Sequence, residues 1–128
     1  LGSGVGRLVA QARLELPPER MARCVGVELS PSRHDLATSG WASLTADGAA
    51  AGGEEAAGVG ALELRCESML ETDLADATHI YVASLCMGDE LLDALWARLR
   101  SGSAPHLRVF ASLREVRAAP ACTEIAEV

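Results

Sequence analysis

Glycines at three alternating positions, Gly2, Gly4 and Gly6, constrain the fold of this chain more than any other sequence feature. Apolar residues follow them at helical spacing, which predicts a helix that ends before Pro17-Pro18. The residues of this apolar face are Val5, Leu8, Val9 and Ala12. A glycine turn at the start of a helix lets the backbone approach a ligand closely, and the first helical turn offers unpaired N–H groups. The pattern therefore predicts a binding loop that leads into a helix.

Short apolar runs alternate with helical segments along the rest of the chain. Strands are predicted over 24–29, 62–66, 79–85 and 107–111, and helices over about 31–44 and 88–100. The 24–29 run ends in one acid and lacks polar alternation, which is typical of a strand buried on both faces of a parallel sheet. This order predicts an α/β fold with right-handed crossovers.

Three further features refine this prediction. Ser30 is expected to cap the second helix, with Pro31 at its first position. Residues 46–60 are rich in glycine and alanine and are expected to form a flexible surface insertion. The alternative is an alanine-rich helix, which each glycine in this segment would destabilise by roughly 1 kcal/mol. An apolar stripe on the last helix is expected to pack in the core, and it comprises Leu91, Leu92, Leu95, Trp96 and Leu99.

Composition excludes several classes of protein. With 128 residues, 49% of them hydrophobic, and a mean hydropathy of +0.17, the chain is expected to form one packed domain. No window approaches the roughly 18 apolar residues that a membrane span needs, so no membrane association is expected. The net charge of −7 argues against direct nucleic-acid binding by this segment. The first residues do not resemble a signal peptide, which predicts an intracellular protein.

The cysteines and histidines do not predict a metal site or a disulfide framework. The cysteines are widely spaced without a CxxC pair, and they are predicted to be free, buried thiols in a reducing compartment. They are Cys24, Cys66, Cys86 and Cys122. The histidines lack metal-ligand spacing.

Glu28 has the sequence position of the acidic residue that binds the ribose in Rossmann-type nucleotide sites. Glu28 follows Gly6 by 22 residues, at the end of the next predicted strand, where its carboxylate could accept hydrogen bonds from ribose hydroxyls. The glycines follow G-x-G-x-G rather than the dinucleotide pattern G-x-G-x-x-G, because position 7 is arginine. This spacing resembles motif I of class I S-adenosylmethionine-dependent methyltransferases. The alternative is a glycine turn without a ligand.

Three longer segments narrow the resemblance. Residues 1–9 with Gln11, residues 25–28 and residues 80–88 resemble the methyltransferase core of the disruptor-of-telomeric-silencing class. Members of that class are histone lysine methyltransferases that use a Rossmann core in place of a SET domain. The similarity covers most of the chain except residues 46–60. It implies a Rossmann-like class I methyltransferase sheet with S-adenosylmethionine as the cofactor.

The resemblance also implies roles for individual residues. The cofactor-binding set would be Gly2, Ser3, Gly4, Gly6, Glu28, Leu29, Ser68, Met69 and Ala83. In it, the glycines line the methionine part, Glu28 holds the ribose, and Ser68 and Met69 lie at the adenine. Ala83 and Ser84 match a pair of family asparagines near the methyl-transfer centre. The chain departs from the family pattern at Ser68, where an aspartate is expected, and at Ala83 and Ser84.

The function implied is methyl transfer to a protein lysine, with a histone as the substrate. The alternatives are a methyltransferase for a small molecule or another protein residue, and a degenerate Rossmann module that binds without turnover. No catalytic residue is assigned, since a neutral leaving group makes positioning the main requirement. The resemblance implies a nuclear location, and without it a cytoplasmic one is expected. Oligomeric state is not predicted.

The resemblance further implies that residues 1–128 form a partial methyltransferase domain. The strand before the glycine loop and the C-terminal strands of the family's sheet are absent from these residues. The strands at 24–29 and 79–85 are therefore expected to stand about 9–10 Å apart, room for one strand, rather than about 4.8 Å. Unpaired backbone groups cost roughly 1–3 kcal/mol each when buried, so these residues alone are expected to be unstable.

Overall fold

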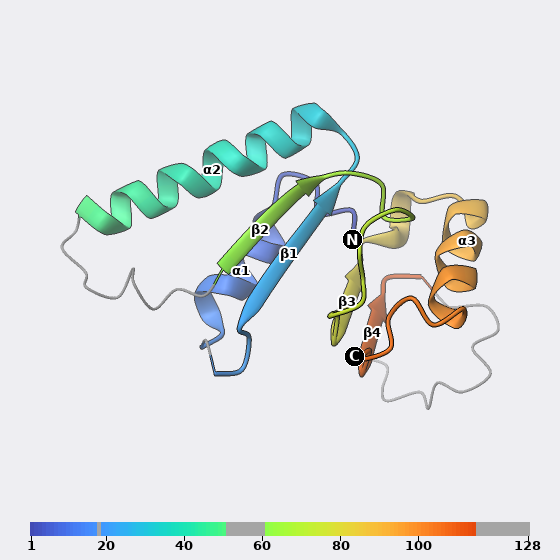
Figure 1. Ribbon diagram of the computed structural model, residues 1–128. Coiled ribbons are helices and arrows are strands. Elements are labelled where there is room, and N and C mark those ends of the chain that lie inside the picture. Colours follow the sequence, from blue (N-terminus) through green and yellow to red (C-terminus); the bar gives the residue numbers. More distant parts are fainter. Residues whose placement is uncertain (18, 51–60, 115–128) are drawn as a thin grey trace.

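The computed structural model describes residues 1–17, 19–50 and 61–114, which form a mixed α/β fold in two halves (Figure 1). The first half contains helix α1 (Arg7–Glu15), strand β1 (Arg23–Glu28), helix α2 (Pro31–Ala50) and strand β2 (Ala61–Cys66). The second half contains strand β3 (His79–Val82), the 3₁₀ helix η2 (Ser84–Cys86), helix α3 (Asp89–Arg100) and strand β4 (Val109–Ser112). The alternation of strands and helices predicted from the sequence is confirmed.

Each half contains one pair of parallel strands. In the first half, β1 pairs with β2 from Arg23 opposite Ala61 to Glu28 opposite Cys66. In the second half, β3 pairs with β4 from His79 opposite Val109 to Val82 opposite Ser112. Because the strands of each pair are parallel and in register, their carboxyl ends lie at the same edge, where α/β proteins place their ligands.

Residues 1–3 lie between the two strand pairs (Figure 1). On one side, the backbone N–H of Ser3 donates to the carbonyl of Val27 in β1 (2.9 Å). On the other side, the backbone nitrogen of Leu1 donates to the carbonyl of Tyr81 in β3 (2.6 Å), and Ala83 N–H donates to Leu1 O (3.4 Å). Among the described residues, β1 and β3 pair with these residues and not with each other. The strand spacing of about 9–10 Å stays a prediction.

Both helices of the first half lie on the same face of β1 and β2. Gly26 of β1 leaves room for Val9 of α1, whose Cγ1 lies 3.1 Å from the position of a Cβ there. Ala37 of α2 lies against Gly6, at 2.9 Å from its Cβ position, and Leu64 of β2 lies near both glycines. Small residues therefore allow close packing of the two helices on the strands.

The apolar face predicted for the first helix is only half correct. Val5 and Leu8 are exposed, whereas Arg13, which is not part of the predicted face, is 3% exposed. The Arg13 guanidinium lies beyond the end of α1, where Nη1 donates to the carbonyls of Leu16 (3.4 Å) and Met21 (3.1 Å). These hydrogen bonds compensate for its burial.

The second half contains the larger apolar cluster. Its buried residues are Leu74, Ile80, Val82 and Leu95. The predicted stripe on α3 is confirmed, since Leu95 is fully buried and Leu92 and Leu99 pack against the cluster. The rings of Trp96 and Phe110 pack against each other, with their centroids 4.4 Å apart. These contacts hold α3 against β3 and β4.

Three boundaries differ from the sequence prediction. Helix α2 continues to Ala50, so residues 46–50 of the predicted insertion are helical, which agrees with the high helix propensity of alanine. Residues 51–60 lie outside the described residues. Strand β3 ends at Val82 because the chain turns into η2, and β4 begins at Val109. Helix α2 begins at Pro31 as predicted, and His34 N–H donates to the carbonyl of Ser30. The predicted side-chain cap is not formed, because the Ser30 hydroxyl contacts Ser32 Oγ (3.1 Å) instead of a backbone N–H.

Cys24, Cys66 and Cys86 are free, as predicted, but only Cys24 is buried. The prediction of buried thiols is wrong for Cys66 and Cys86. Cys66 is the last residue of β2, at the end of the strand, and Cys86 is the last residue of η2. Cys122 lies outside the described residues. None of the helices described is both long enough and apolar enough to cross a membrane.

Candidate functional site

The predicted cofactor residues meet at the carboxyl ends of the strands. Gly4 N–H donates to the Glu28 carboxylate at Oε2 (2.8 Å), which joins the glycine loop to the end of β1. Glu67 N–H donates to the Glu28 carbonyl (3.1 Å), which brings the segment before Ser68 to the same place. The structure thus brings together residues that are far apart in the sequence.

The glycine loop uses backbone conformations that suit glycine. Gly2, Gly4 and Gly6 have φ angles of 67°, 57° and 77°, in the left-handed region. Gly6 is the residue before α1, and its close contact with Ala37 leaves no space for a side chain. Nothing described lies within 4 Å of a Cβ position at Gly4. Ser3 turns its hydroxyl toward β1, with Oγ 3.2 Å from the Cβ position of Gly26, so the ligand-facing surface of the loop is backbone.

The Glu28 carboxylate is the buried polar centre of the candidate site. The residue is 5% exposed and accepts hydrogen bonds from Gly4 N–H, Ser30 N–H (2.9 Å) and the guanidinium of Arg33. Burial by itself raises the pKa of Glu28, but the hydrogen bonds from Ser30, Arg33 and Gly4 outweigh it and hold this pKa below its ordinary value. Glu28 is therefore an ionised acceptor at neutral pH. Leu29, beside it, is exposed.

The segment after β2 forms a tight turn at Ser68 and Met69. Ser68 Oγ accepts a hydrogen bond from Leu70 N–H (3.2 Å), and its carbonyl accepts from Glu71 and Thr72. The hydroxyl thus stabilises its own turn. The Met69 side chain points to the glycine loop, with Cε 3.8 Å from the Cβ position of Gly2.

Arg98 of α3 holds this turn in place, a role that the sequence analysis missed. Its Nη1 donates to the carbonyl of Met69 (2.9 Å) and its Nη2 to the carbonyl of Thr72. Nothing in the local pattern singles out Arg98, since a basic residue near the end of a helix is common. The contact depends on how α3 is placed, which the sequence pattern does not specify.

Ala83 and Ser84, at the end of β3, do not present polar groups to a ligand. Ser84 is fully buried, and its hydroxyl pairs with Ser112 Oγ (2.7 Å) and accepts from Arg114 N–H (2.9 Å). Its role is to join the ends of β3 and β4. Ala83 offers a methyl group and a backbone N–H that donates to Leu1 O. The amide pair of the resembling family has no counterpart here.

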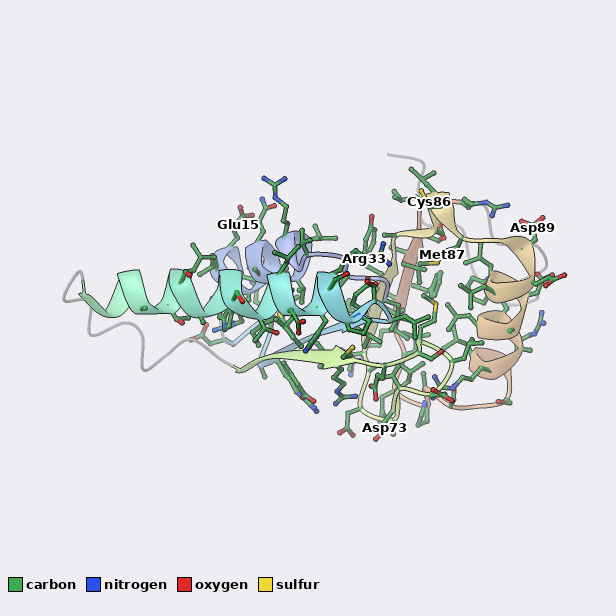
Figure 2. The ribbon with its side chains drawn as sticks, turned by 90° about the horizontal axis from the view of Figure 1, so that it is seen from above. Glu15, Arg33, Asp73, Cys86, Met87 and Asp89 are labelled. Atoms are coloured by element: carbon green, nitrogen blue, oxygen red, sulfur yellow. The ribbon has the colours of Figure 1, made fainter. Side chains whose placement is uncertain are left out.

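Met87 occupies space next to the glycine loop. Its Cε lies 2.5 Å from the Cβ position of Gly2, so even a methyl group at position 2 would collide with it. Figure 2 labels Met87 beside Cys86, in the segment that leads into α3. Thioether side chains are adaptable, so the side chains of both methionines beside Gly2 can rearrange at low cost.

One hollow lies on the other side of the loop and is not this site. It has a volume of about 140 Å³ and lies between α1, α2 and β2. Its wall is largely apolar and includes Val5, Ala10, Trp41, Leu44 and Leu62, whereas Glu28 and Met69 are not part of it. It is smaller than the roughly 300 Å³ at which small-molecule pockets begin. No group of three metal-binding side chains gathers in the described parts of the chain.

Comparisons with models of known protein families, with curated proteins and with solved structures found no match to this chain. The site is therefore interpreted from its own geometry and from the sequence motifs.

Proposed function

We propose that this chain binds S-adenosylmethionine at the carboxyl edge of its strands and belongs to the catalytic core of a protein-lysine methyltransferase, with a histone as the expected substrate. The observation that carries the proposal is the 2.8 Å hydrogen bond between Gly4 N–H and Glu28 Oε2. It supports the proposal because a glycine loop and a ribose-binding carboxylate must lie within one nucleoside of each other.

The residues at this edge fit an adenosyl ligand. The backbone of Gly2 and Gly4 would lie along the methionine part, the Glu28 carboxylate would accept hydrogen bonds from the ribose, and the Met69 side chain would contact the adenine. The bound cofactor would supply an activated methyl group on a sulfonium. These residues bind and orient, and no general base among them is required for transfer to a neutral amine.

The acceptor amine must lose its proton before it can react. Holding a lysine neutral at pH 7 costs roughly 4–5 kcal/mol from its reference pKa, and burial in an apolar channel can provide this shift. The exposed apolar side chains of Leu29 and Leu85 adjoin the carboxyl ends of β1 and β3 and are available for such a channel.

The arrangement of the strands also supports a Rossmann-like sheet. The order across the two halves is β2, β1, residues 1–3, β3 and β4, and both observed pairs are parallel. A Rossmann sheet has the same order, with the strand before the glycine loop at its centre.

A binding module without turnover is the second candidate. It is favoured by Ser84, whose hydroxyl is buried and fully engaged with Ser112 and Arg114, and by Ala83, which carries no polar group. In this alternative the same edge binds the adenosyl ligand, but nothing at the end of β3 orients an acceptor.

Calorimetric titration of the chain with S-adenosylmethionine, and separately with NAD, tests the proposal. We expect binding of S-adenosylmethionine, and a loss of about 10- to 100-fold in affinity for Glu28→Gln, as expected for hydrogen bonds to a charged group. Glu63→Gln, on the neighbouring strand β2, is the matched control and should bind as the unaltered protein does. Circular dichroism confirms that both variants fold.

The outcomes separate the candidates. Binding of NAD alone would overturn the cofactor assignment. Binding of S-adenosylmethionine without methyl transfer to lysine peptides or histones would favour the module without turnover. Equal loss of binding in both variants would remove Glu28 from its proposed role.

A further inference from the structure

Arg33 occupies one of the two oxygens of the Glu28 carboxylate. It lies in the first turn of α2, and both Nε (2.9 Å) and Nη2 (2.7 Å) donate to Oε1. Ser30 N–H donates to the same oxygen (2.9 Å), so Oε1 accepts from three N–H groups. The other oxygen, Oε2, accepts only from Gly4 N–H among the described residues.

This distribution leaves too few acceptor sites for a ribose. A carboxylate offers about four lone-pair sites, two on each oxygen. Oε1 has more donors than lone pairs, and Oε2 has one lone pair to spare. A ribose presents two neighbouring hydroxyls, which need one acceptor site on each oxygen to bind side by side. Because three donors meet two lone pairs on Oε1, the second hydroxyl can be accepted only after two of these donors leave.

Of the three donors on Oε1, only those of Arg33 can leave. The N–H of Ser30 is backbone at the junction of β1 and α2, and moving it would disrupt both elements. The Arg33 side chain is 58% exposed, whereas that of Glu28 is 6% exposed. Its guanidinium can therefore swing into water, where exposed ion pairs are weak because water replaces the lost contact. Figure 2 shows Arg33 at the end of α2 nearest to the second half.

We infer that Arg33 is a displaceable cap on the ribose-binding carboxylate, which releases Oε1 when an adenosyl ligand binds. The inference rests on the proposed function. It assigns Arg33 a competing role, in which the side chain keeps Glu28 ionised and satisfied in the free protein and lowers ligand affinity. The cap therefore lowers affinity only for ligands with both ribose hydroxyls, since only these need an acceptor site on Oε1.

Titration with S-adenosylhomocysteine, which lacks the sulfonium charge, tests this inference. We expect Arg33→Ala to lower the Kd by roughly three- to tenfold, in line with the loss of a half-exposed competing ion pair. Arg33→Lys keeps the charge but cannot donate from two nitrogens at once, and should give a smaller decrease. Arg20→Ala removes one exposed cation before β1, at the opposite end of that strand from Glu28, and should leave the Kd unchanged.

Two further measurements distinguish competition from a general effect. The affinity of the unaltered protein should rise with salt, which weakens the Arg33 pair, whereas Arg33→Ala should lose this dependence. For adenosine against 2′-deoxyadenosine, the gain from Arg33→Ala should be found only with adenosine. The Arg33 Nε–H resonance should lose its protection from exchange when the ligand is added.

The results separate this inference from the proposed function. If the unaltered protein binds the ligand and Arg33→Ala binds it equally well or more weakly, Arg33 is not a competing cap. The proposed function would be unaffected by that result. Binding by Arg33→Ala alone would support the cap. Absence of binding in both proteins would overturn the cap together with the proposed function.

Discussion

The two halves of the molecule are held together by different interactions. The second half has a contiguous apolar cluster around Leu95 and Val82, with an aromatic pair beside it. In the first half, Cys24, Val27 and Ala37 are the buried apolar residues, while Arg13 and Glu28 are buried charged ones. Arg13 even keeps an Nε without a hydrogen-bond partner in the described residues.

This difference shows where stability and binding reside. Apolar burial contributes stability without directional requirements, so the second half can serve as a support. Buried charges contribute little net stability, but they fix donors and acceptors at defined positions. The first half therefore presents the candidate site, and the second half holds its outer segments in place through residues such as Arg98.

The largest expected effect is the loss of a core side chain in the second half. Leu95→Ala should lower the free energy of unfolding by about 3–4 kcal/mol, because Leu95 is fully buried in the apolar cluster. Leu36→Ala on α2, where the side chain is 63% exposed, is the matched control and should change it by less than about 0.5 kcal/mol. Pulse proteolysis in urea measures both. If both substitutions lowered the free energy of unfolding equally, the apolar cluster of the second half would not be its main source of stability.

A smaller effect is expected from the glycine loop of the first half. Gly6→Ala should cost about 2–3 kcal/mol, since the new methyl group would meet the Ala37 Cβ and the residue has a positive φ. Gly4→Ala has the same backbone strain without the contact and should cost about 1–2 kcal/mol. The same unfolding measurement applies. If Gly4→Ala were the more costly variant, close helix packing would not explain Gly6.

The polar link between β3 and β4 should contribute about 1 kcal/mol. Ser84→Ala removes the hydroxyl that accepts from Arg114 N–H, although Ser112 Oγ lies 3.4 Å from the same donor and compensates in part. Ligand affinity should not change if Ser84 is structural. A parallel calorimetric titration checks this. A large loss of affinity in Ser84→Ala would show that Ser84 contributes to ligand binding.

The smallest effect concerns the ion pairs across β1 and β2. Hydrogen bonds from Arg65 and Arg23 lower the pKa of Glu63 to about 2. Its contribution to stability is therefore present above its ordinary pKa of 4.5 and is lost as the pH falls toward 2. Because Glu63 is exposed, this contribution should stay below about 1 kcal/mol.

Unfolding at pH 7 and pH 3 tests this expectation. The loss of stability between the two pH values should be smaller in Glu63→Gln than in the unaltered protein. Glu19→Gln, an exposed acid in the turn before β1, should retain the full loss. An unchanged pH dependence in Glu63→Gln would show that these ion pairs contribute nothing measurable.

Much of the fold could be predicted from the sequence because short-range patterns decide it. The stripe around Leu95 predicted α3 from its helical periodicity. The short apolar run over 24–29 predicted β1, a strand buried on both faces, because it lacks polar alternation. The burial of Arg13 and the extension of α2 to Ala50 were missed. The first depends on a guanidinium that meets the carbonyls of Leu16 and Met21 beyond the end of α1, and the second on alanine propensity, which outweighs Gly48.

For the site, the sequence predicted which backbone segments meet but not what their side chains do. Glu28 and the glycines were predicted from spacing. The contacts of Arg33 and Arg98 were not. The Arg33 contact depends on how its side chain turns toward Glu28 at the junction of β1 and α2, and the Arg98 contact depends on where α3 is placed relative to a distant turn. Ser84 was placed at the end of β3 correctly, yet its burial follows from Ser112 and Arg114, which approach only when β4 pairs.

Backbone hydrogen bonds connect the loop to both halves, from Leu1 to β3 and from Ser3 to β1. A ligand that binds this loop would therefore contact a segment that is bonded to both halves. By thermodynamic linkage, such a ligand would couple the unfolding of the two halves, and a change that lowers the folded population of either half would weaken the apparent affinity in proportion.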